Sequence, residues 1–329
     1  MFKAVGSPAA PAPPWKARHA DDDYGAGAEP NWREVDWQGH LNQTEIDGVE
    51  INYVDIGSGA DNPVIFVHGL AGQWQNWLEN IPRISQERRV IAPDLPGHGA
   101  SGPPRDEFSI SGCGRVVHGL AQRLGIERAM VVGNSMGGFV SSEVAIQFPD
   151  FVERLMLVSA AGISSASVSQ APVMTLGRVG QALTSVTAAR HRKLAARPVT
   201  RHFAMALVAR HPSRLKGDFV WEGFMTGAGR PSFLDALRAN LDYDFRERIS
   251  EIRCPTLIVW GGEDAIIPVR DADEYERLID DARKVVMEDT GHIPMAERPA
   301  AFNDLLLEFI AETGPAEDKE PVDHESERV

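Results

Sequence analysis

Short apolar runs alternate with amphipathic stretches along most of the chain, a pattern typical of a mainly parallel β-sheet covered by helices. The central runs are continuous in hydrophobicity, as expected of strands buried on both faces. The pattern predicts strands at Val35–Ile46, Val49–Ile56, Val64–Val67, Val90–Ala92, Met130–Val132, Leu155–Val158, Thr256–Trp260 and Lys284–Met287. It predicts helices at Ser109–Leu124, Ser135–Phe148, Asp271–Ile279 and Pro299–Glu312.

The alternation stops between Gly162 and Ile249, where Ala, Leu and Arg dominate and no strand is predicted. We interpret residues 162–249 as a helical insertion into an α/β core formed by residues 31–161 and 250–312. Residues 1–30 are rich in Pro, Ala, Gly and Asp, and residues 313–329 are polar and charged. These compositions predict a flexible tail at each end of the chain, and the tail over residues 313–329 is expected to be acidic and disordered.

One predicted strand runs directly into the sequence Gly-Asn-Ser-Met-Gly at 133–137, and a predicted helix follows. Small residues at 133 and 137 permit a sharp, strained turn that lifts the Ser135 hydroxyl above the sheet. The N-terminus of the following helix favours a developing negative charge. This arrangement predicts that Ser135 is a catalytic nucleophile rather than an idle residue in a glycine-rich turn.

A serine hydroxyl needs a base, and the base needs an orienting acid. His292 follows the last predicted strand, and Asp264 follows the strand before it. We predict that His292 is the general base and that Asp264 fixes its tautomer, with Glu263 as the competing candidate for the acid. The backbone N–H groups of Met136 and Leu70 are the predicted oxyanion donors.

Five segments, HGLAG (68–72), DLPGHGASG (94–102), GNSMGG (133–138), GGED (261–264) and GHIP (291–294), occur in an order that resembles the α/β-hydrolase superfamily, particularly its lid-bearing esterases and lipases. The resemblance covers residues 45–312. It implies an α/β-hydrolase fold, with a mostly parallel eight-stranded sheet flanked by helices and residues 162–249 as a helical cap. It also implies structural roles for Asp94 and His98, while we expect His68 to shape its own turn.

The resemblance leaves several serine chemistries open. Hydrolysis of medium-chain or aryl carboxylic esters is the expected activity, because Pro96-Gly97-His98-Gly99 resembles the corresponding loop of esterases and lipases. The segment GNSMGG resembles the elbow of meta-cleavage-product hydrolases, which favours carbon–carbon bond hydrolysis as the alternative. Thioesterase, lactonase and perhydrolase activities use the same triad and also remain open. A pure binding role is disfavoured, since the nucleophile, base, acid and both oxyanion loops are all present.

The acyl pocket is less defined by the sequence. Trp74, Trp221 and Phe224 are the predicted substrate-binding residues. They belong to a wider set of apolar candidates that also includes Trp77, Met136, Met174, Leu207 and Met225. For each of them, burial in the core is an equally good interpretation.

The chain has 329 residues, 33 Lys and Arg, 47 Asp and Glu, and a net charge of −14, which argues against nucleic-acid binding. Cys113 and Cys254 are far apart and predict buried thiols. No metal-ligand cluster or dinucleotide motif is found, so no cofactor is expected. No apolar run reaches the roughly 18 residues of a membrane span, and no secretory signal is recognised, so a cytoplasmic enzyme acting on a small-molecule ester is expected. The oligomeric state is left open.

The charge is distributed unevenly. No Asp or Glu occurs from Ile163 to Gly217, whereas nine cationic residues do: Arg178, Arg190, Arg192, Lys193, Arg197, Arg201, Arg210, Arg214 and Lys216. The predicted cap is therefore basic. Two interpretations follow: the cap docks on an acidic body, or it attracts anionic substrates or an anionic lipid surface.

Overall fold

The computed structural model describes residues 8–59, 61–165, 171, 173–175, 177–178, 181, 191–225 and 230–312. Its centre is one eight-stranded sheet with the strand order β1-β2-β4-β3-β5-β6-β7-β8. The strand β2 is antiparallel to both of its neighbours, and the pairs from β4 to β8 are parallel. The strands are β1 Leu41–Ile46, β2 Val49–Ile56, β3 Val64–Val67, β4 Val90–Pro93, β5 Ala129–Asn134, β6 Val152–Val158, β7 Thr256–Gly261 and β8 Ala282–Met287.

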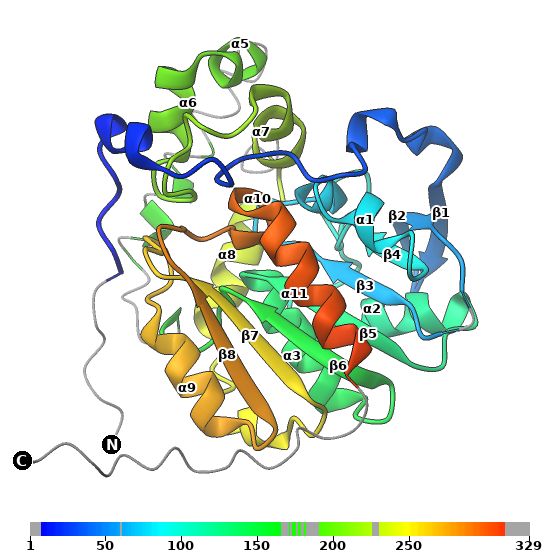
Figure 1. Ribbon diagram of the computed structural model, residues 1–329. Helices are drawn as coiled ribbons and strands as arrows, with labels where there is room; N and C mark the ends of the chain where they lie inside the picture. The colour runs from blue at the N-terminus through cyan, green and yellow to red at the C-terminus, as the bar shows by residue number, and fades with distance from the viewer. Residues whose placement is uncertain are drawn as a thin grey trace, which may run out of the picture.

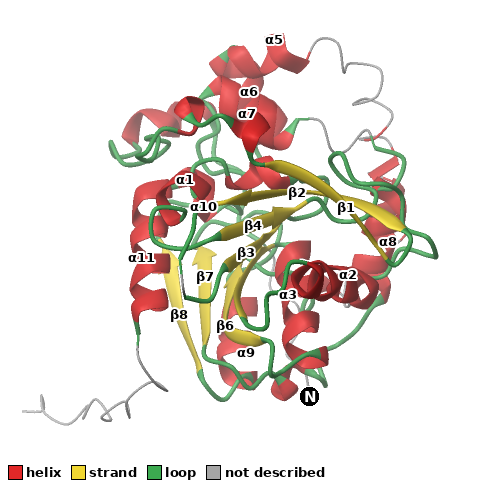
Figure 2. Cartoon of the chain, turned by 90° about the vertical axis from the view of Figure 1, so that its right-hand side faces the viewer, coloured by secondary structure: helices red, strands yellow, loops and turns green. Residues whose placement is uncertain are grey.

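Helices cover both faces of the sheet, so the expected α/β architecture is confirmed. In the core they are α1 Ile81–Ile84, α2 Ile110–Arg123, α3 Met136–Gln147, α9 Arg270–Leu278, α10 Pro294–Glu297 and α11 Pro299–Ala311. Helices α2 and α3 lie on one side of the sheet, and α1, α10 and α11 lie on the other (Figures 1 and 2). The four helices predicted from periodicity all form, each within two residues of its predicted ends.

The central strands divide their side chains between two hydrophobic clusters, because successive residues of a strand point to opposite faces. Val131 and Leu157 pack with α2 and α3, whereas Val132 and Val158 pack with α11. All six residues of β5 are buried, as are all six of β7. Burial on both faces explains the continuous apolar runs in the sequence.

The start of the chain differs from the prediction. The strand expected over Val35–Ile46 begins only at Leu41, and short 3₁₀ helices at Trp32–Glu34 and Trp37–Gly39 precede it. Residues 8–30 are not the flexible tail that we expected, because they pack against the body and bury Tyr24 to 1% exposure. The buried side chain of Tyr24 anchors this segment to the body despite its Pro- and Ala-rich composition. The predictions for residues 1–7 and 313–329 lie outside the described residues.

Between β6 and β7 the described chain forms α5 His191–Ala196, α6 Pro198–Met205, α7 Gly217–Phe224 and α8 Phe233–Asp242. We call this segment the cap. Helices α5, α6 and α7 lie beyond the end of the sheet that carries the strand-to-loop junctions of Ser135 and His292 (Figure 1). Among the described helices, none combines the length and the apolar character needed to cross a bilayer.

Candidate active site

Ser135 occupies the sharp turn between β5 and α3 that the sequence predicts. Its φ of 57° and ψ of −122° lie in a strained region that non-glycine residues rarely adopt. A side chain on Gly133 would collide with the carbonyl of Gly137, and one on Gly137 would collide with the carbonyl of Val67. The two glycines therefore allow the strand, the turn and the helix to pack this closely. Met136 begins α3 directly after the serine.

Asp264 and His292 meet although 28 positions separate them. The Nδ1 of His292 lies 2.8 Å from Oδ2 of Asp264, and both side chains are buried. The other carboxylate oxygen of Asp264 accepts hydrogen bonds from the backbone N–H groups of Ile266 and Ile267 at 2.8 and 2.9 Å. The carboxylate is thus held rigidly, and as an acceptor it keeps the proton on Nδ1 of His292. This leaves Nε2 of His292 free to act as a base.

The competing acid, Glu263, has a different contact. Its carboxylate accepts a hydrogen bond from the backbone N–H of Thr290 at 3.0 Å, two residues before His292. Glu263 therefore supports the histidine loop, and Asp264 is the residue that contacts the imidazole.

His68 is structural, as expected. Its Nε2 accepts a hydrogen bond from the N–H of Leu95 at 3.0 Å, so the proton is on Nδ1, which donates to the carbonyl of Gly69 at 2.8 Å. Complete burial lowers the pKa of His68 to about 4. Both ring nitrogens are occupied in joining the loops after β3 and β4, so this ring is not a second base.

The loop from Asp94 to Gly102 is organised around the Asp94 carboxylate. That carboxylate accepts hydrogen bonds at 2.8 Å from the N–H of Trp74, the side chain of Asn52 and the N–H of Ala100. Asp94 thereby fixes the loop after β3, which carries Leu70, relative to β2 and β4. These contacts explain the structural role that the family resemblance implies for Asp94.

Ser135 and His292 both line a cavity of about 760 Å³ between the sheet and the cap. The loop after β3 contributes Leu70 to its wall, and the cap contributes Met205 and Leu237, among others. No Lys, Arg, Asp or Glu is found among the described residues that line it. The cavity is therefore largely apolar and carries no fixed charge on its described walls.

Of the predicted substrate-binding residues, one lines the cavity and two do not. Phe224 lines the cavity, and so does Met225 from the wider candidate set. Trp74 is instead a core residue, because it is buried and packs against Trp37 with ring centroids 4.9 Å apart. Trp221 packs against the same hydrophobic cluster and is not among the residues that line the cavity. Trp74 is thus placed in the core and Trp221 half-buried on α7, and neither is among the described residues that line the cavity.

The predicted oxyanion donors have suitable locations. Leu70 lines the cavity, and Met136 is the first residue of α3. A side chain on Gly69 would approach Cβ of Ser135 to 3.1 Å, so the loop that carries Leu70 passes very close to the nucleophile. The donor pair itself stays a prediction.

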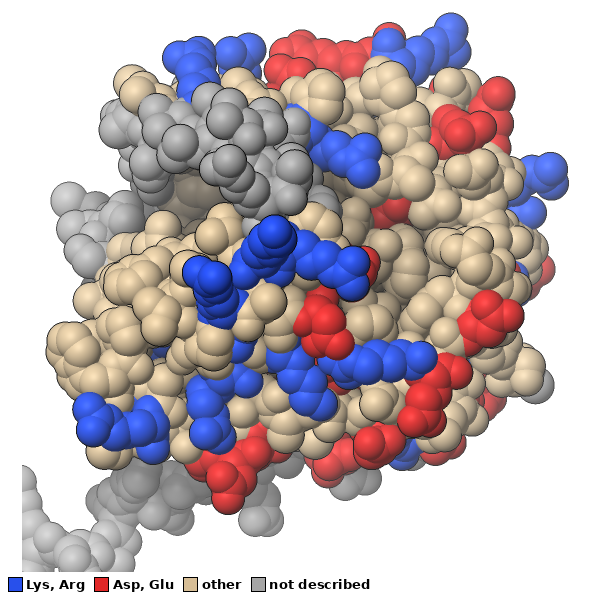
Figure 3. All heavy atoms as spheres, turned by 90° about the horizontal axis from the view of Figure 1, so that it is seen from above, with Lys and Arg blue, Asp and Glu red and all other residues tan. Residues whose placement is uncertain are grey.

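The basic residues of the cap have mixed surroundings. Arg201 is buried and donates to the carbonyls of Ala195, Pro212 and Ser213 within the cap. The guanidinium of Arg210 lies 3.6 Å from Asp289 of the core. Arg192, Lys193 and Arg197, among others, are exposed. Seen from above, Lys and Arg side chains gather near the middle of this face, with acidic side chains among them and around them (Figure 3).

Two further residues beside His292, Glu297 and Tyr24, are not predicted by the sequence patterns. Glu297 is fully buried and accepts hydrogen bonds from the N–H groups on both sides of His292. The hydroxyl of Tyr24 donates to the same carboxylate. The signal that the sequence offers for Glu297 is its position five residues after His292. Nothing in the sequence connects Tyr24 to a residue 273 positions away.

A family model described as the alpha/beta hydrolase fold matches residues 62–299. The chain is an α/β hydrolase. A 2-hydroxy-6-oxo-2,4-heptadienoate hydrolase of Pseudomonas putida is 32% identical over 278 residues, covering 80% of this chain and 94% of the relative. An uncharacterised protein of Mycobacterium tuberculosis is 30% identical over 276 residues, covering 79% of this chain and 78% of the relative.

Solved structures resemble this α/β hydrolase over most of its length. A meta-cleavage product hydrolase matches with a TM-score of 0.66 and 26% identity, covering 84% of this chain and all of the other. The structure of an enol-lactonase from Burkholderia xenovorans also matches, with a TM-score of 0.66 and 23% identity. The match covers 82% of this chain and all of the lactonase chain. At that identity the second match shows the fold alone.

Proposed function

We propose that this α/β hydrolase cleaves carboxylic esters with neutral, medium-chain or aryl acyl groups, through an acyl-enzyme on Ser135. The observation that carries the proposal is the Asp264–His292 hydrogen bond at the wall of an apolar cavity that also contains the strained Ser135. An apolar cavity favours an apolar acyl chain, because burying each methylene contributes about 0.8 kcal/mol.

In the proposed reaction, the Oγ of Ser135 attacks the acyl carbon while Nε2 of His292 takes its proton. Asp264 stabilises the imidazolium that forms and holds it in position. The N–H groups of Met136 and Leu70 stabilise the oxyanion. His292 then protonates the leaving alcohol, and afterwards it activates a water molecule that releases the acid from Ser135.

The alternative is hydrolysis of a carbon–carbon bond next to a ketone, which the names of the relatives and the GNSMGG elbow favour. Substrates of that class, such as the dienoate in the relative's name, carry a carboxylate. Burying a carboxylate without a cationic partner is costly, and no Lys or Arg is found among the described residues of the cavity wall. This observation makes the ester the preferred substrate class.

The test compares p-nitrophenyl acetate, butyrate and octanoate with 2-hydroxy-6-oxo-2,4-heptadienoate, using the wild type and Ser135→Ala. We expect kcat/KM for butyrate to exceed that for acetate by about tenfold, since two more methylenes are buried. Ser135→Ala should lose about 10⁴-fold or more of the activity. Faster cleavage of the dienoate than of any ester would replace the proposal by the alternative, and equal ester hydrolysis by both proteins would refute the mechanism.

A further inference from the structure

Glu297 holds the loop of His292 from both sides. It lies in α10, is fully buried, and its Oε1 accepts hydrogen bonds from the N–H groups of Gly291 at 3.0 Å and Ile293 at 3.2 Å. Its Oε2 also accepts from Gly291 at 2.9 Å. Since these two residues flank His292, the carboxylate fixes the backbone from which the imidazole projects.

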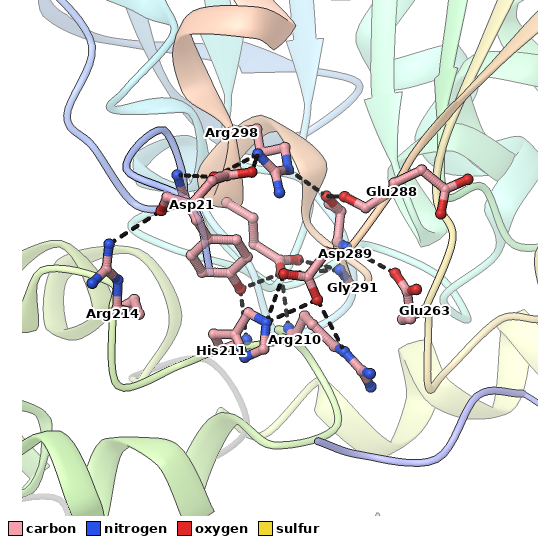
Figure 4. Close-up of polar contacts among 12 residues, drawn as sticks. Asp21, Arg210, His211, Arg214, Glu263, Glu288, Asp289, Gly291 and Arg298 are labelled. Atoms are coloured by element: carbon pink, nitrogen blue, oxygen red, sulfur yellow. Dashed lines mark hydrogen bonds and ion pairs between the residues drawn. The ribbon is translucent and has the colours of Figure 1, made fainter. Parts of the chain in front are cut away.

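Two further donors to this carboxylate come from outside the α/β core. The N–H of Arg210 in the cap donates to Oε2 at 2.8 Å, and the hydroxyl of Tyr24 in the N-terminal segment donates to the same oxygen. Tyr24 in turn accepts a hydrogen bond from the N–H of His211 at 2.7 Å, which ties the N-terminal segment to the cap. Figure 4 shows Arg210 and His211 of the cap close to Gly291.

Other contacts surround the same loop. The N–H of His292 itself donates to the carbonyl of Val208 in the cap at 3.0 Å. His211 Nε2 lies 2.9 Å from the carboxylate of Asp289, just before the loop. Arg298 donates to the side chain of Thr290 at 2.8 Å. It also donates to Asp21 of the N-terminal segment at 3.0 Å (Figure 4). The histidine loop is therefore enclosed by the cap and the N-terminal segment as well as by α10.

The chemistry of the carboxylate suits this position. Its donors are three backbone N–H groups and one hydroxyl, and a carboxylate, unlike an amide, can accept from all of them. Burial raises the pKa of Glu297, and these hydrogen bonds act in the opposite direction. In Glu297→Gln an NH₂ group would face at least one N–H donor, so the loop would have to move.

We propose that Glu297 is a positioning residue for His292, and that Tyr24 makes this positioning depend on the docked N-terminal segment. The inference rests on the proposed function, because it treats His292 as the base of Ser135. A displacement of the imidazole by about 1 Å lowers the rate by about 100-fold, since reacting groups must be aligned within a few tenths of an ångström. Substrate binding in the cavity depends on other residues and should change little.

The decisive variant is Tyr24→Phe, which removes one hydroxyl and keeps the buried ring. Its matched control is Tyr243→Phe, because Tyr243 also donates to a buried glutamate, Glu143, at 2.8 Å, away from the histidine loop. We expect kcat for p-nitrophenyl butyrate to fall about tenfold in Tyr24→Phe with KM changed less than twofold, and to stay within twofold in the control. Glu297→Gln should lower kcat by about 100-fold. If Glu297→Gln does not fold, Tyr24→Phe still decides the question.

A second readout does not depend on activity. The proton on Nδ1 of His292, hydrogen-bonded to Asp264, gives a far-downfield proton NMR signal, which should shift or broaden in Tyr24→Phe and stay unchanged in Tyr243→Phe. An unchanged kcat and an unchanged signal in Tyr24→Phe would overturn the inference. A wild type that cleaves no ester, but whose signal responds to Tyr24→Phe, would refute the ester proposal and leave the positioning role standing.

Discussion

The catalytic edge of the sheet is held in place by continuous strand pairing, which the described part of the cap above it lacks. The strands that lead to Ser135 and Asp264 are buried along their whole length and paired on both sides. The cap is joined to the core by buried apolar residues such as Phe219 and Val220, which share a hydrophobic cluster with Trp77. Separate polar contacts, such as that between Arg210 and Glu297, also join the two. Its helix α6 buries Met205 toward the cavity and exposes Phe203 to solvent at 68%. The sheet thus sets the positions of Ser135 and Asp264, while the cap shapes the cavity above them through a mixture of apolar and polar contacts.

The largest expected effect concerns the catalytic edge alone. Asp264→Asn keeps the shape of the side chain, but its amide favours the wrong tautomer of His292, so kcat should fall by about 10⁴-fold. The neighbouring Glu263→Gln is the matched control and should stay within about tenfold of the wild type, since Glu263 contacts the loop backbone instead of the imidazole. Steady-state kinetics on p-nitrophenyl butyrate measure both. A larger loss in Glu263→Gln than in Asp264→Asn would assign the acid to Glu263.

A second pair of variants compares the stability of the two regions. Leu157→Ala leaves a cavity beside a fully buried strand and should lower the free energy of unfolding by about 2–5 kcal/mol. Leu207→Ala changes a cap side chain that is 52% exposed, and its effect should stay within about 0.5 kcal/mol. Urea denaturation measures both values. Equal losses would show that the exposed Leu207 of the cap contributes as much to stability as the buried Leu157 of the sheet.

These two regions also differ in how well the sequence predicts them. Strands such as Thr256–Trp260 are recognised because burial on both faces leaves a continuous apolar run. Ser135, Asp264 and His292 are recognised because loops after neighbouring parallel strands meet at one sheet edge, and Asp264 and His292 do meet there. The shape of the cap follows from neither rule.

The incorrect predictions have physical reasons. An indole ring is equally suited to a cavity wall and to a core, so composition could not show that Trp74 packs against Trp37. The Pro-, Ala-, Gly- and Asp-rich composition of the N-terminal segment predicts a flexible tail, yet the segment is anchored by Tyr24 and its hydrogen bonds. Polar networks of this kind join residues that are distant in sequence and leave no periodic pattern.

A pH effect should appear beneath the catalytic edge. Burial lowers the pKa of His68 to about 4 and, with the help of neighbouring His68, that of His98 to about 3. In the unfolded chain each histidine has a pKa of about 6.5. At pH values between about 6.5 and the lowered pKa of each ring, the unfolded chain therefore binds more protons than the folded protein. The free energy of unfolding then falls as the pH drops, by up to about 1.4 kcal/mol per pH unit for each ring. The raised pKa of buried Asp94 acts in the opposite direction.

The variant His98→Asn isolates one of these rings, because its amide can keep the hydrogen bond to the carbonyl of Pro96. Between pH 6.5 and 4.5 its stability should depend on pH less steeply than that of the wild type, by about 1 kcal/mol per pH unit. Urea denaturation at several pH values gives both slopes. Identical slopes would mean that folding does not lower the pKa of His98.

The smallest expected effect belongs to the exposed cations of the cap. Of the two interpretations of the basic cap, attraction of anionic substrates would act outside the cavity, by long-range steering from exposed residues such as Arg192, Lys193 and Arg197, and can be tested separately. Raising the salt from about 0.01 M to about 1 M should lower kcat/KM for a carboxylate-bearing ester by about two- to threefold, because screening shortens the range of the field. A neutral ester is the control and should change little. Equal responses of both esters would favour the interpretation that the cap's charge serves docking on the acidic body.

The central claim is that Ser135 is a nucleophile activated by His292 and Asp264. A fluorophosphonate reacts with such a serine covalently, whatever ester the enzyme prefers. Intact mass and peptide mapping of the treated protein should show one adduct, on Ser135, and Ser135→Ala should remain unlabelled. A wild-type protein without an adduct on Ser135, or an equal adduct in Ser135→Ala, would contradict the account.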